Sequence, residues 1–457
     1  METLVQNLWT KSKTLVKGLI IGLLALILQI PAFYVQDLVA ERETRQREAV
    51  AEVSSKWAAA QTVTGPVLVL PYWETKADAN TSNATRTKQY AFFLPDDLSI
   101  QADVTPEERH RGIYKVMLYS SNVSIRGKFQ NLSIEKLNIL PENIIWSEAA
   151  VKLPITDNMG LNEEVVLKWN DSTLALSPQT SDDRSFTNAL QANLQVSSLQ
   201  DLQNVSFASS FSLNGSQQVL FSPTGKTTTV VMNSAWPHPS FKGTMLPQKT
   251  EIGPKGFSAT WKSISHKRNF PQQWTGTSYS FSPFEFNTNG DAITATRDVQ
   301  ANNINASAFG ASLFMPVNSY QKTMRSVKYA ALCILLTFAS FFLIEINNKK
   351  SVHPFQYGLI GLALILFYTL LLSFSEYIGF NLSYVIASVF TISLIGWFVK
   401  GLLSSSRLAS ILSVILILLY VYVFTILQLQ DYSLLLGSIG LFITLAVIMH
   451  FSKKIQW

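Results

Sequence analysis

Three ionisable side chains at the ends of long apolar runs are the residues of this sequence best suited to chemistry. They are Glu345, His353 and Glu376. Deep inside a membrane span such groups mark proton or substrate pathways, which usually lie near the bilayer midplane. At a membrane boundary they serve instead as salt-bridge partners or helix caps. Because all three lie at boundaries, we predict the second role and keep a proton or substrate role as the alternative.

No complete catalytic or metal-binding motif accompanies these residues. The Gly-Lys-Thr triplet at 225–227 resembles the end of a phosphate-binding loop, but Leu220 occupies a position that requires glycine. Two Ser-x-x-Lys stretches, at Ser133 and Ser319, lack the companion motifs of penicillin-recognising enzymes. The histidines are scattered, with no His-Glu-x-x-His and no Cys/His cluster. We therefore expect no catalytic residue, no cofactor and no metal site.

Six uncharged apolar runs must position these side chains: residues 18–36, 329–344, 351–375, 377–399, 408–430 and 432–452. Most contain the roughly 20 apolar residues that a helix needs to cross a bilayer. We predict six transmembrane helices, one N-terminal and five C-terminal, the last five forming a domain over residues 329–452. The first run lacks the small residues that precede a signal-peptide cleavage site, so we predict an uncleaved anchor.

The charges of the short loops predict the orientation of these helices. Basic residues precede the first span, follow the sixth, and lie between spans two and three and between spans four and five. The two remaining short loops carry no lysine or arginine. The positive-inside rule then places both termini, residues 1–17 and 453–457, in the cytoplasm, and residues 37–328 outside it. Glu345 and His353 would lie at the inner boundary and Glu376 at the outer one.

The segment after the first span predicts a membrane-proximal helical stalk over residues 37–65. Val39, Val50, Val53 and Trp57 recur at near-helical spacing. Acid–base pairs four residues apart, with the acid first, add support on the exposed face. The Gly-Pro pair at 65–66 is a typical helix end.

From residue 66 to 328 the hydrophobic period changes to two, which predicts a large, mostly antiparallel β domain. The strand patterns include "PVLVLPYW", "YKVMLYSS", "NVSIRGKF", "VVLKW" and "FSATWKSI". "SPTG" at 222–225 lies between two such runs and predicts a hairpin turn. Both a sandwich and a barrel fit this pattern.

The distribution of charge excludes a nucleic-acid partner and favours the lipid bilayer. Residues 36–328 contain 27 Lys+Arg and 26 Asp+Glu, a net charge of +1, so +5 of the total net charge of +6 belongs to the flanks of the apolar runs. A nucleic-acid binder would concentrate basic residues on its water-facing part. Cys333 is the one cysteine, which excludes an intramolecular disulfide. A domain of this size has a sufficient core without one.

Several stretches, in one order along the chain, resemble the CreD family of bacterial inner-membrane proteins, which is named for cell-envelope integrity. They are "ERETRQREAVAEV" with "TGPVLVLPY", "ERHRGIYKVMLY", "WPHPSF", "GFSATW", "NFPQQW", and the block from "FGASLFMPVNSYQK" to "LLLSFSEYIGF". The resemblance implies a Gram-negative inner-membrane protein with a large periplasmic domain, linked to a two-component regulatory system and envelope stress. It assigns no role to Glu345, His353 or Glu376.

These observations lead to one functional hypothesis and two alternatives. The hypothesis is a non-enzymatic protein that supports envelope integrity, with its periplasmic β domain docking envelope proteins. The first alternative is a membrane carrier of a lipid, drug or other amphiphile, formed by the C-terminal spans. The second is an enzyme acting on envelope polymers, which needs a polar pocket that the sequence does not reveal.

Overall fold

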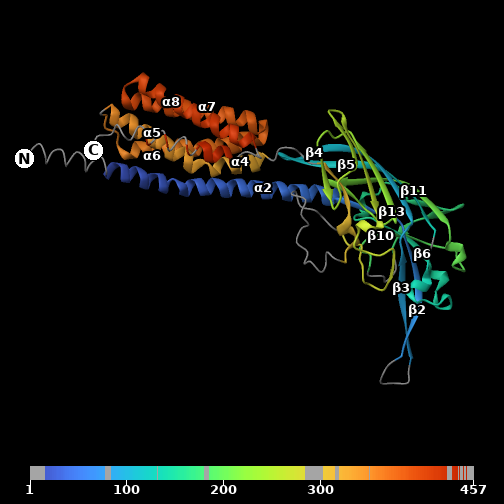
Figure 1. The fold of residues 1–457 in the computed structure, drawn as a ribbon. Coiled ribbons are helices and arrows are strands. Elements are labelled where there is room, and N and C mark those ends of the chain that lie inside the picture. The colour runs from blue at the N-terminus through green and yellow to red at the C-terminus, as the bar shows by residue number, and fades with distance from the viewer. Residues whose placement is uncertain are drawn as a thin grey trace, which may run out of the picture. The chain divides into compact units, whose positions relative to one another are not determined.

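The structure is a computed structural model of the 457-residue chain. It describes residues 16–77, 84–130, 132–179, 185–283, 302–313, 319–348, 350–429 and, in part, 435–449. The chain forms two compact units, Met1–Arg47 with Val317–Trp457 and Glu48–Pro316. The first unit is helical and the second is built mainly from strands (Figure 1).

Long apolar helices make up the first unit. Residues 16–27 are helical, and α2 (Gln29–Trp57) follows after a single turn residue. The C-terminal helices are α4 (Ser319–Lys328), α5 (Ala330–Asn347), α6 (Pro354–Ile378), α7 (Phe380–Leu403) and α8 (Ser406–Gln428). Within the described residues, Val16–Trp57 and α5 to α8 are long and apolar enough to cross a membrane. The sixth predicted span, residues 432–452, lies mostly outside the described residues.

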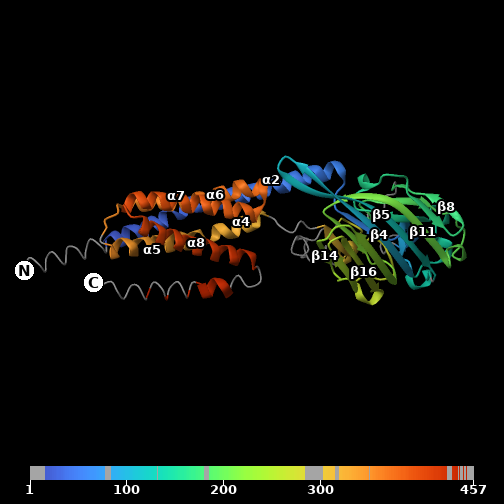
Figure 2. The same ribbon diagram turned by 90° about the horizontal axis from the view of Figure 1, so that it is seen from above.

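Short connections make the C-terminal helices antiparallel neighbours. Gly379 alone joins α6 to α7, and its φ of 79° is a conformation that glycine adopts without a Cβ penalty. Ser405 begins α8 by accepting a hydrogen bond from the amide of Leu408. Helix α6 contacts α7, and α7 contacts α8, so these helices run side by side (Figure 2). Tyr384 fixes two of them by donating a hydrogen bond to the carbonyl of Tyr420 at 2.9 Å.

The structure corrects the sequence prediction at residues 319–328. These residues were predicted to end the β domain, but they form α4, which belongs to the helical unit. Tyr320, Thr323, Ser326 and Val327 are its buried residues. This spacing follows one face of a helix, and a strand pattern would require every second residue to be buried.

The prediction of a helical stalk up to residue 65 is also wrong in its last part. Helix α2 ends at Trp57, and residues Gln61–Thr64 form strand β1. Gln61 explains the change, because its buried amide donates hydrogen bonds to the carbonyls of Asp157 and Asn214, 2.9 and 3.0 Å away. Tertiary bonds of this kind override a local helical preference.

The described residues of the β unit form three sheets. The first has the order β1-β12-β18-β14, the second β17-β3-β2-β6-β10-β9, and the third β15-β16-β13-β4-β5-β11-β7-β8. The strands are β1 (Gln61–Thr64), β2 (Val67–Ala77), β3 (Ala84–Phe93), β4 (Asp97–Arg111), β5 (Tyr114–Phe129), β6 (Ala150–Pro154), β7 (Val166–Trp169), β8 (Ser172–Ala175), β9 (Ser177–Pro178), β10 (Ala189–Asn193), β11 (Val205–Ser216), β12 (Gln218–Ser222), β13 (Thr227–Ser234), β14 (Pro239–Gly243), β15 (Lys249–Gly253), β16 (Gly256–Ile264), β17 (Gln273–Thr275) and β18 (Phe309–Leu313).

Most strand pairs are antiparallel, as the sequence predicted. Among the described strands two pairs are parallel, β1 with β12 and β4 with β13. The predicted hairpin at "SPTG" is wrong, because β12 and β13 belong to different sheets. The segment carries the chain from the four-stranded sheet to the eight-stranded one, and the local turn residues could not reveal that each strand pairs with a distant partner.

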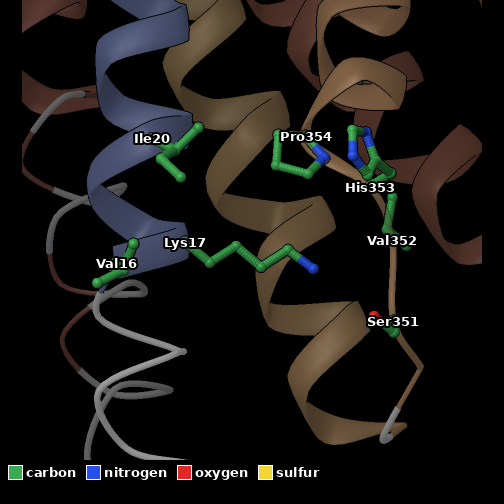
Figure 3. Close-up of a pocket in the computed structure, with 7 residues that line it drawn as sticks. All are labelled: Val16, Lys17, Ile20, Ser351, Val352, His353 and Pro354. Atoms are coloured by element: carbon green, nitrogen blue, oxygen red, sulfur yellow. The ribbon is translucent and has the colours of Figure 1, made fainter.

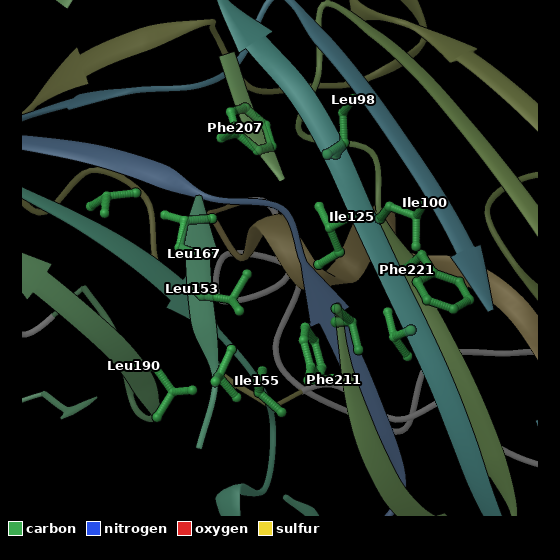
Figure 4. Close-up of a cluster of buried hydrophobic side chains, with 14 of the residues drawn as sticks. Leu98, Ile100, Ile125, Leu153, Ile155, Leu167, Leu190, Phe207, Phe211 and Phe221 are labelled. Atoms are coloured by element: carbon green, nitrogen blue, oxygen red, sulfur yellow. The ribbon is translucent and has the colours of Figure 1, made fainter. Parts of the chain in front are cut away.

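One hydrophobic core joins the three sheets. Strand β4 alternates exposed and buried residues over Asp97–Val104, so Leu98 and Ile100 point inward while their neighbours face outward. Leu153 and Leu190 join this core from the second sheet, and Phe221 from the first (Figure 4). The alternation leaves the opposite face of the large sheet polar and exposed.

Candidate functional site

Glu345 lies in a buried polar cluster near the end of α5. The residue is 4% exposed. Its Oε1 forms an ion pair with Lys17 and accepts a hydrogen bond from the amide of Val352 at 2.9 Å. Its Oε2 accepts a hydrogen bond from the hydroxyl of Tyr357 at 2.7 Å. Both carboxylate oxygens are therefore engaged, and three chain segments meet at this side chain.

Two aromatic side chains of α5 pack against Tyr357, which lies in the first turns of α6. Its ring packs against Phe341 with centroids 4.9 Å apart and meets the edge of Phe338 at 5.5 Å. The residue is fully buried. This packing holds the ring with its hydroxyl directed at Glu345, because a tyrosine ring has few rotamers.

A pocket of about 480 Å³ lies beside this cluster, lined by Val16, Lys17 and Ile20 of the first helix and by residues 351–354, the loop before α6 and the first residue of that helix. Lys17 extends from the first helix toward the loop (Figure 3). The other polar residues of the lining are Ser351 and His353. The pocket thus combines a basic end with an apolar wall formed by Val16 and Ile20.

His353 caps α6. Its Nδ1 accepts a hydrogen bond from the amide of Phe355 at 3.2 Å, and the Gln356 side chain accepts one from the His353 amide at 2.9 Å. Pro354 at the first helical position completes this helix start. The imidazole is exposed and lines the pocket, and no hydrogen bond links it to Glu345 in the described part of the chain.

Glu376, near the end of α6, has weaker contacts. Its carboxylate lies 3.8 Å from Nε of Arg42 in α2 and accepts a hydrogen bond from the hydroxyl of Tyr320 in α4 at 3.2 Å. The Glu376 side chain is 9% exposed and that of Arg42 is 40% exposed. This carboxylate connects three helices, but its positive partner faces solvent.

The structure brings two of the three predicted residues together and leaves the third apart. Glu345 and His353 lie at the same end of the bundle, where a loop connects α5 to α6. Glu376 follows Tyr357 by 19 positions on α6. At about 1.5 Å per residue this is a separation of about 28 Å along the helix. Glu345 and Glu376 therefore cannot act on one bound molecule of ordinary size.

The sequence did not indicate the partners of these carboxylates. Lys17 is one of the basic residues before the first span, which predicted only the orientation of the helices, and no pattern singled out Tyr357 or Tyr320. Lys17 and Glu345 are 328 positions apart. A helix periodicity reveals pairs three or four residues apart, so no local pattern could have found this one. Within the described residues, no group of three or more His, Cys, Asp or Glu could hold a metal ion.

The apolar helices and the large β unit define an integral membrane protein that carries one folded, mostly antiparallel β domain. Comparison with known proteins agrees. The family model described as inner membrane protein CreD matches residues 13–457, so the chain belongs to the CreD family. The inner membrane protein CreD of Escherichia coli (strain K12) is 27% identical over 434 residues, which cover 94% of this chain and 91% of that protein. The predicted family resemblance is confirmed, and the chain is an inner-membrane protein.

Proposed function

We propose that this protein supports the integrity of the cell envelope without catalysis, by docking other envelope proteins on its β domain. The proposal further places both termini in the cytoplasm and the β domain in the periplasm. The observation that carries it is an exposed strand edge. Strand β15 is the last strand of the eight-stranded sheet and pairs, among the described strands, with β16 alone.

This edge is suited to protein partners. Ile252 in β15 is 56% exposed, and Leu246 just before the strand is 75% exposed. An open edge offers backbone N–H and C=O groups to a strand of another chain, and the neighbouring apolar side chains add specificity. The charged Lys249 and Glu251 limit nonspecific pairing of the same edge.

The contacts of Glu345 support a structural role for the bundle. A carboxylate held by a lysine, a tyrosine hydroxyl and an amide is fixed in place, whereas a proton carrier must change partners during its cycle. We therefore assign the docking activity to the β domain and an anchoring role to the helices.

The experiment compares Ile252→Asp with Leu140→Asp in cells that lack their own copy of the protein. Both residues are 56% exposed, and both lie in the β domain, so the two changes are matched in chemistry and exposure. We expect Ile252→Asp to remove protection against detergent stress and Leu140→Asp to retain it, at equal protein levels. A photo-crosslinkable residue at position 252 should capture one envelope protein in stoichiometric amount.

Equal protection by the two variants, with no crosslinked protein at position 252, would reject docking at this edge. A control crosslinker at Trp397, which is 74% exposed on α7, should capture lipid alone. Orientation is tested separately with a cysteine placed at the exposed Ser210. A membrane-impermeant thiol reagent should modify it once the outer membrane is opened.

The pocket beside Lys17 and His353 is the observation that favours the alternative, a carrier of amphiphiles. Ser351→Trp would fill this pocket from an exposed loop position. A carrier requires this change to abolish protection, whereas docking requires that it have little effect. The Ser351 and Ile252 variants together therefore decide between the two functions.

A further inference from the structure

The exposed face of the eight-stranded sheet contains a basic pocket of about 590 Å³. Three exposed cations line it, Arg126 and Lys128 from β5 and Lys168 from β7. Their neighbours Ile125 and Leu167 point into the core (Figure 4). The alternation of the strands thus places all three charges on the same side of the sheet.

The strand register brings these cations together around a small residue. Ala208 in β11 is the direct cross-strand partner of Arg126 on one side and of Lys168 on the other. Neighbouring strands are about 4.8 Å apart, so the backbones of the two cations are about 10 Å apart. Lys128 lies two residues from Arg126, or about 7 Å along the strand. The alanine leaves open space between three long side chains that can converge above it.

Hydroxyl groups surround the same space. Ser99 is the cross-strand partner of Arg126, and Ser206 is the partner of Lys128. Thr227 and Thr229 contribute two more hydroxyls from β13. Asp97 is the one acidic residue of the lining, so the cations outnumber the acids by three to one.

The charges of this pocket are available for a ligand. None of the three cations forms an ion pair with another described residue. The tip of the β4–β5 hairpin differs, because Arg111 pairs with Glu52 at 2.9 Å and Lys115 pairs with Glu108 at 2.7 Å. These pairs neutralise the cations near the tip, whereas the pocket keeps a net positive field, with three cations against Asp97, the cross-strand partner of Lys128.

We propose that this pocket binds a cluster of phosphate groups on an envelope molecule. Guanidinium forks and ammonium groups are the side chains that recognise phosphate, and hydroxyls donate to its remaining oxygens. A protein partner fits less well. Lysine and serine are depleted at protein interfaces, and the aromatic residue of the lining, Phe207, is 3% exposed and belongs to the core.

The phosphate cluster can belong to a lipid headgroup or to a soluble phosphate ester, and both present the same chemistry. The proposed periplasmic position of the β domain decides only where the ligand comes from. Binding itself does not depend on docking at β15, which lies at an edge of the sheet and is separated by β16 from β13, the nearest strand of the pocket.

The test uses the full chain in lipid nanodiscs with tripolyphosphate as the soluble probe, measured by calorimetry. We expect binding that weakens with added salt, and at least a tenfold loss in the Arg126→Gln/Lys168→Gln double variant. Lys262→Gln is the matched control, because Lys262 is exposed on the same sheet but does not line the pocket. It should change the affinity less than twofold. Both variants should retain the wild-type thermal midpoint, because all three side chains are exposed.

A second arm adds phosphatidylcholine vesicles with or without cardiolipin, whose headgroup carries two phosphates. Cosedimentation with the cardiolipin vesicles, reversed by tripolyphosphate and lost in the double variant, would assign the site to a lipid headgroup. Tripolyphosphate binding alone would assign it to a soluble ester. Absence of binding in both arms, binding that the double variant retains, or binding of polyglutamate in place of tripolyphosphate would each overturn the proposal.

Discussion

Glu345 and Glu376 lie at opposite ends of one helical bundle, and the bundle holds them in different ways. Glu345 uses both oxygens, and its three partners come from the first helix, the loop before α6 and α6 itself. Glu376 has a 3.8 Å ion pair with a half-exposed arginine and one hydrogen bond of 3.2 Å. Both carboxylates follow an apolar run in the sequence, but in the structure they differ in burial and in the number of their contacts.

The difference indicates where the bundle is fixed and where it can adjust. Removing one partner of a buried ion pair leaves the other charge without compensation, which is costly. A long ion pair with an exposed partner contributes little, because solvent screens it. We infer that the Glu345 end locks the first helix to α5 and α6, while the Glu376 end restrains α2 and α4 loosely.

The largest expected effect is that of Glu345→Ala. This change leaves the Lys17 ammonium, the Tyr357 hydroxyl and the Val352 amide without their acceptor. We expect a destabilisation of the bundle by about 3 kcal/mol. The reactivity of Cys333 reports this destabilisation, because Cys333 is the one cysteine of the chain and is 2% exposed in α5. Its modification by a thiol reagent reports opening of the bundle alone and should become about a hundredfold faster.

Glu345→Gln is the matched control for this prediction. It keeps an acceptor for the tyrosine and the amide but removes the charge opposite Lys17, so its effect should lie between those of wild type and Glu345→Ala. A Cys333 modification rate for Glu345→Ala equal to that of wild type would show that the cluster does not hold the bundle together.

An intermediate effect is expected for Tyr357→Phe. The change removes only the hydroxyl that donates to Glu345, and hydrogen bonds to charged groups contribute about 1.5–3 kcal/mol. The matched variant at the other end is Tyr320→Phe, which removes the hydroxyl that donates to Glu376. We expect Cys333 to react at least three times faster in Tyr357→Phe than in Tyr320→Phe. Equal rates in the two variants would mean that the ends of the bundle do not differ.

The sequence predicted the parts of this molecule that depend on local patterns. Apolar run length predicted the spans, and the alternation in "NVSIRGKF" and "VVLKW" predicted strands. Prediction from the sequence failed where contacts between residues far apart in the chain decide the structure. The buried amide of Gln61 fixes β1 through Asp157 and Asn214, which are 96 and 153 positions away. The basic pocket was missed for the same reason, since only the pairing of β5, β11 and β7 places Arg126 near Lys168.

The candidate site shows the same limit. Glu345, His353 and Glu376 were selected because ionisable groups are rare in apolar segments, and this signal is local. Their partners are not local. Nothing near Lys17 in the sequence distinguishes it from the other lysines that set the topology, and Tyr357 is one of many aromatic residues in an apolar run. The separation of the three residues into two ends followed only from the helix packing.

The smallest expected effect is that of Glu376→Gln. The change removes the negative charge opposite Arg42 but keeps an oxygen that can accept from Tyr320. Because Arg42 is 40% exposed and the ion pair is long, we expect a loss of about 0.5 kcal/mol. Cys333 modification should then accelerate by no more than about threefold. An acceleration as large as that of Glu345→Ala would reverse the comparison. The contact among α2, α4 and α6 would then contribute most to the stability of the bundle. Arg42 would be the first residue to test next.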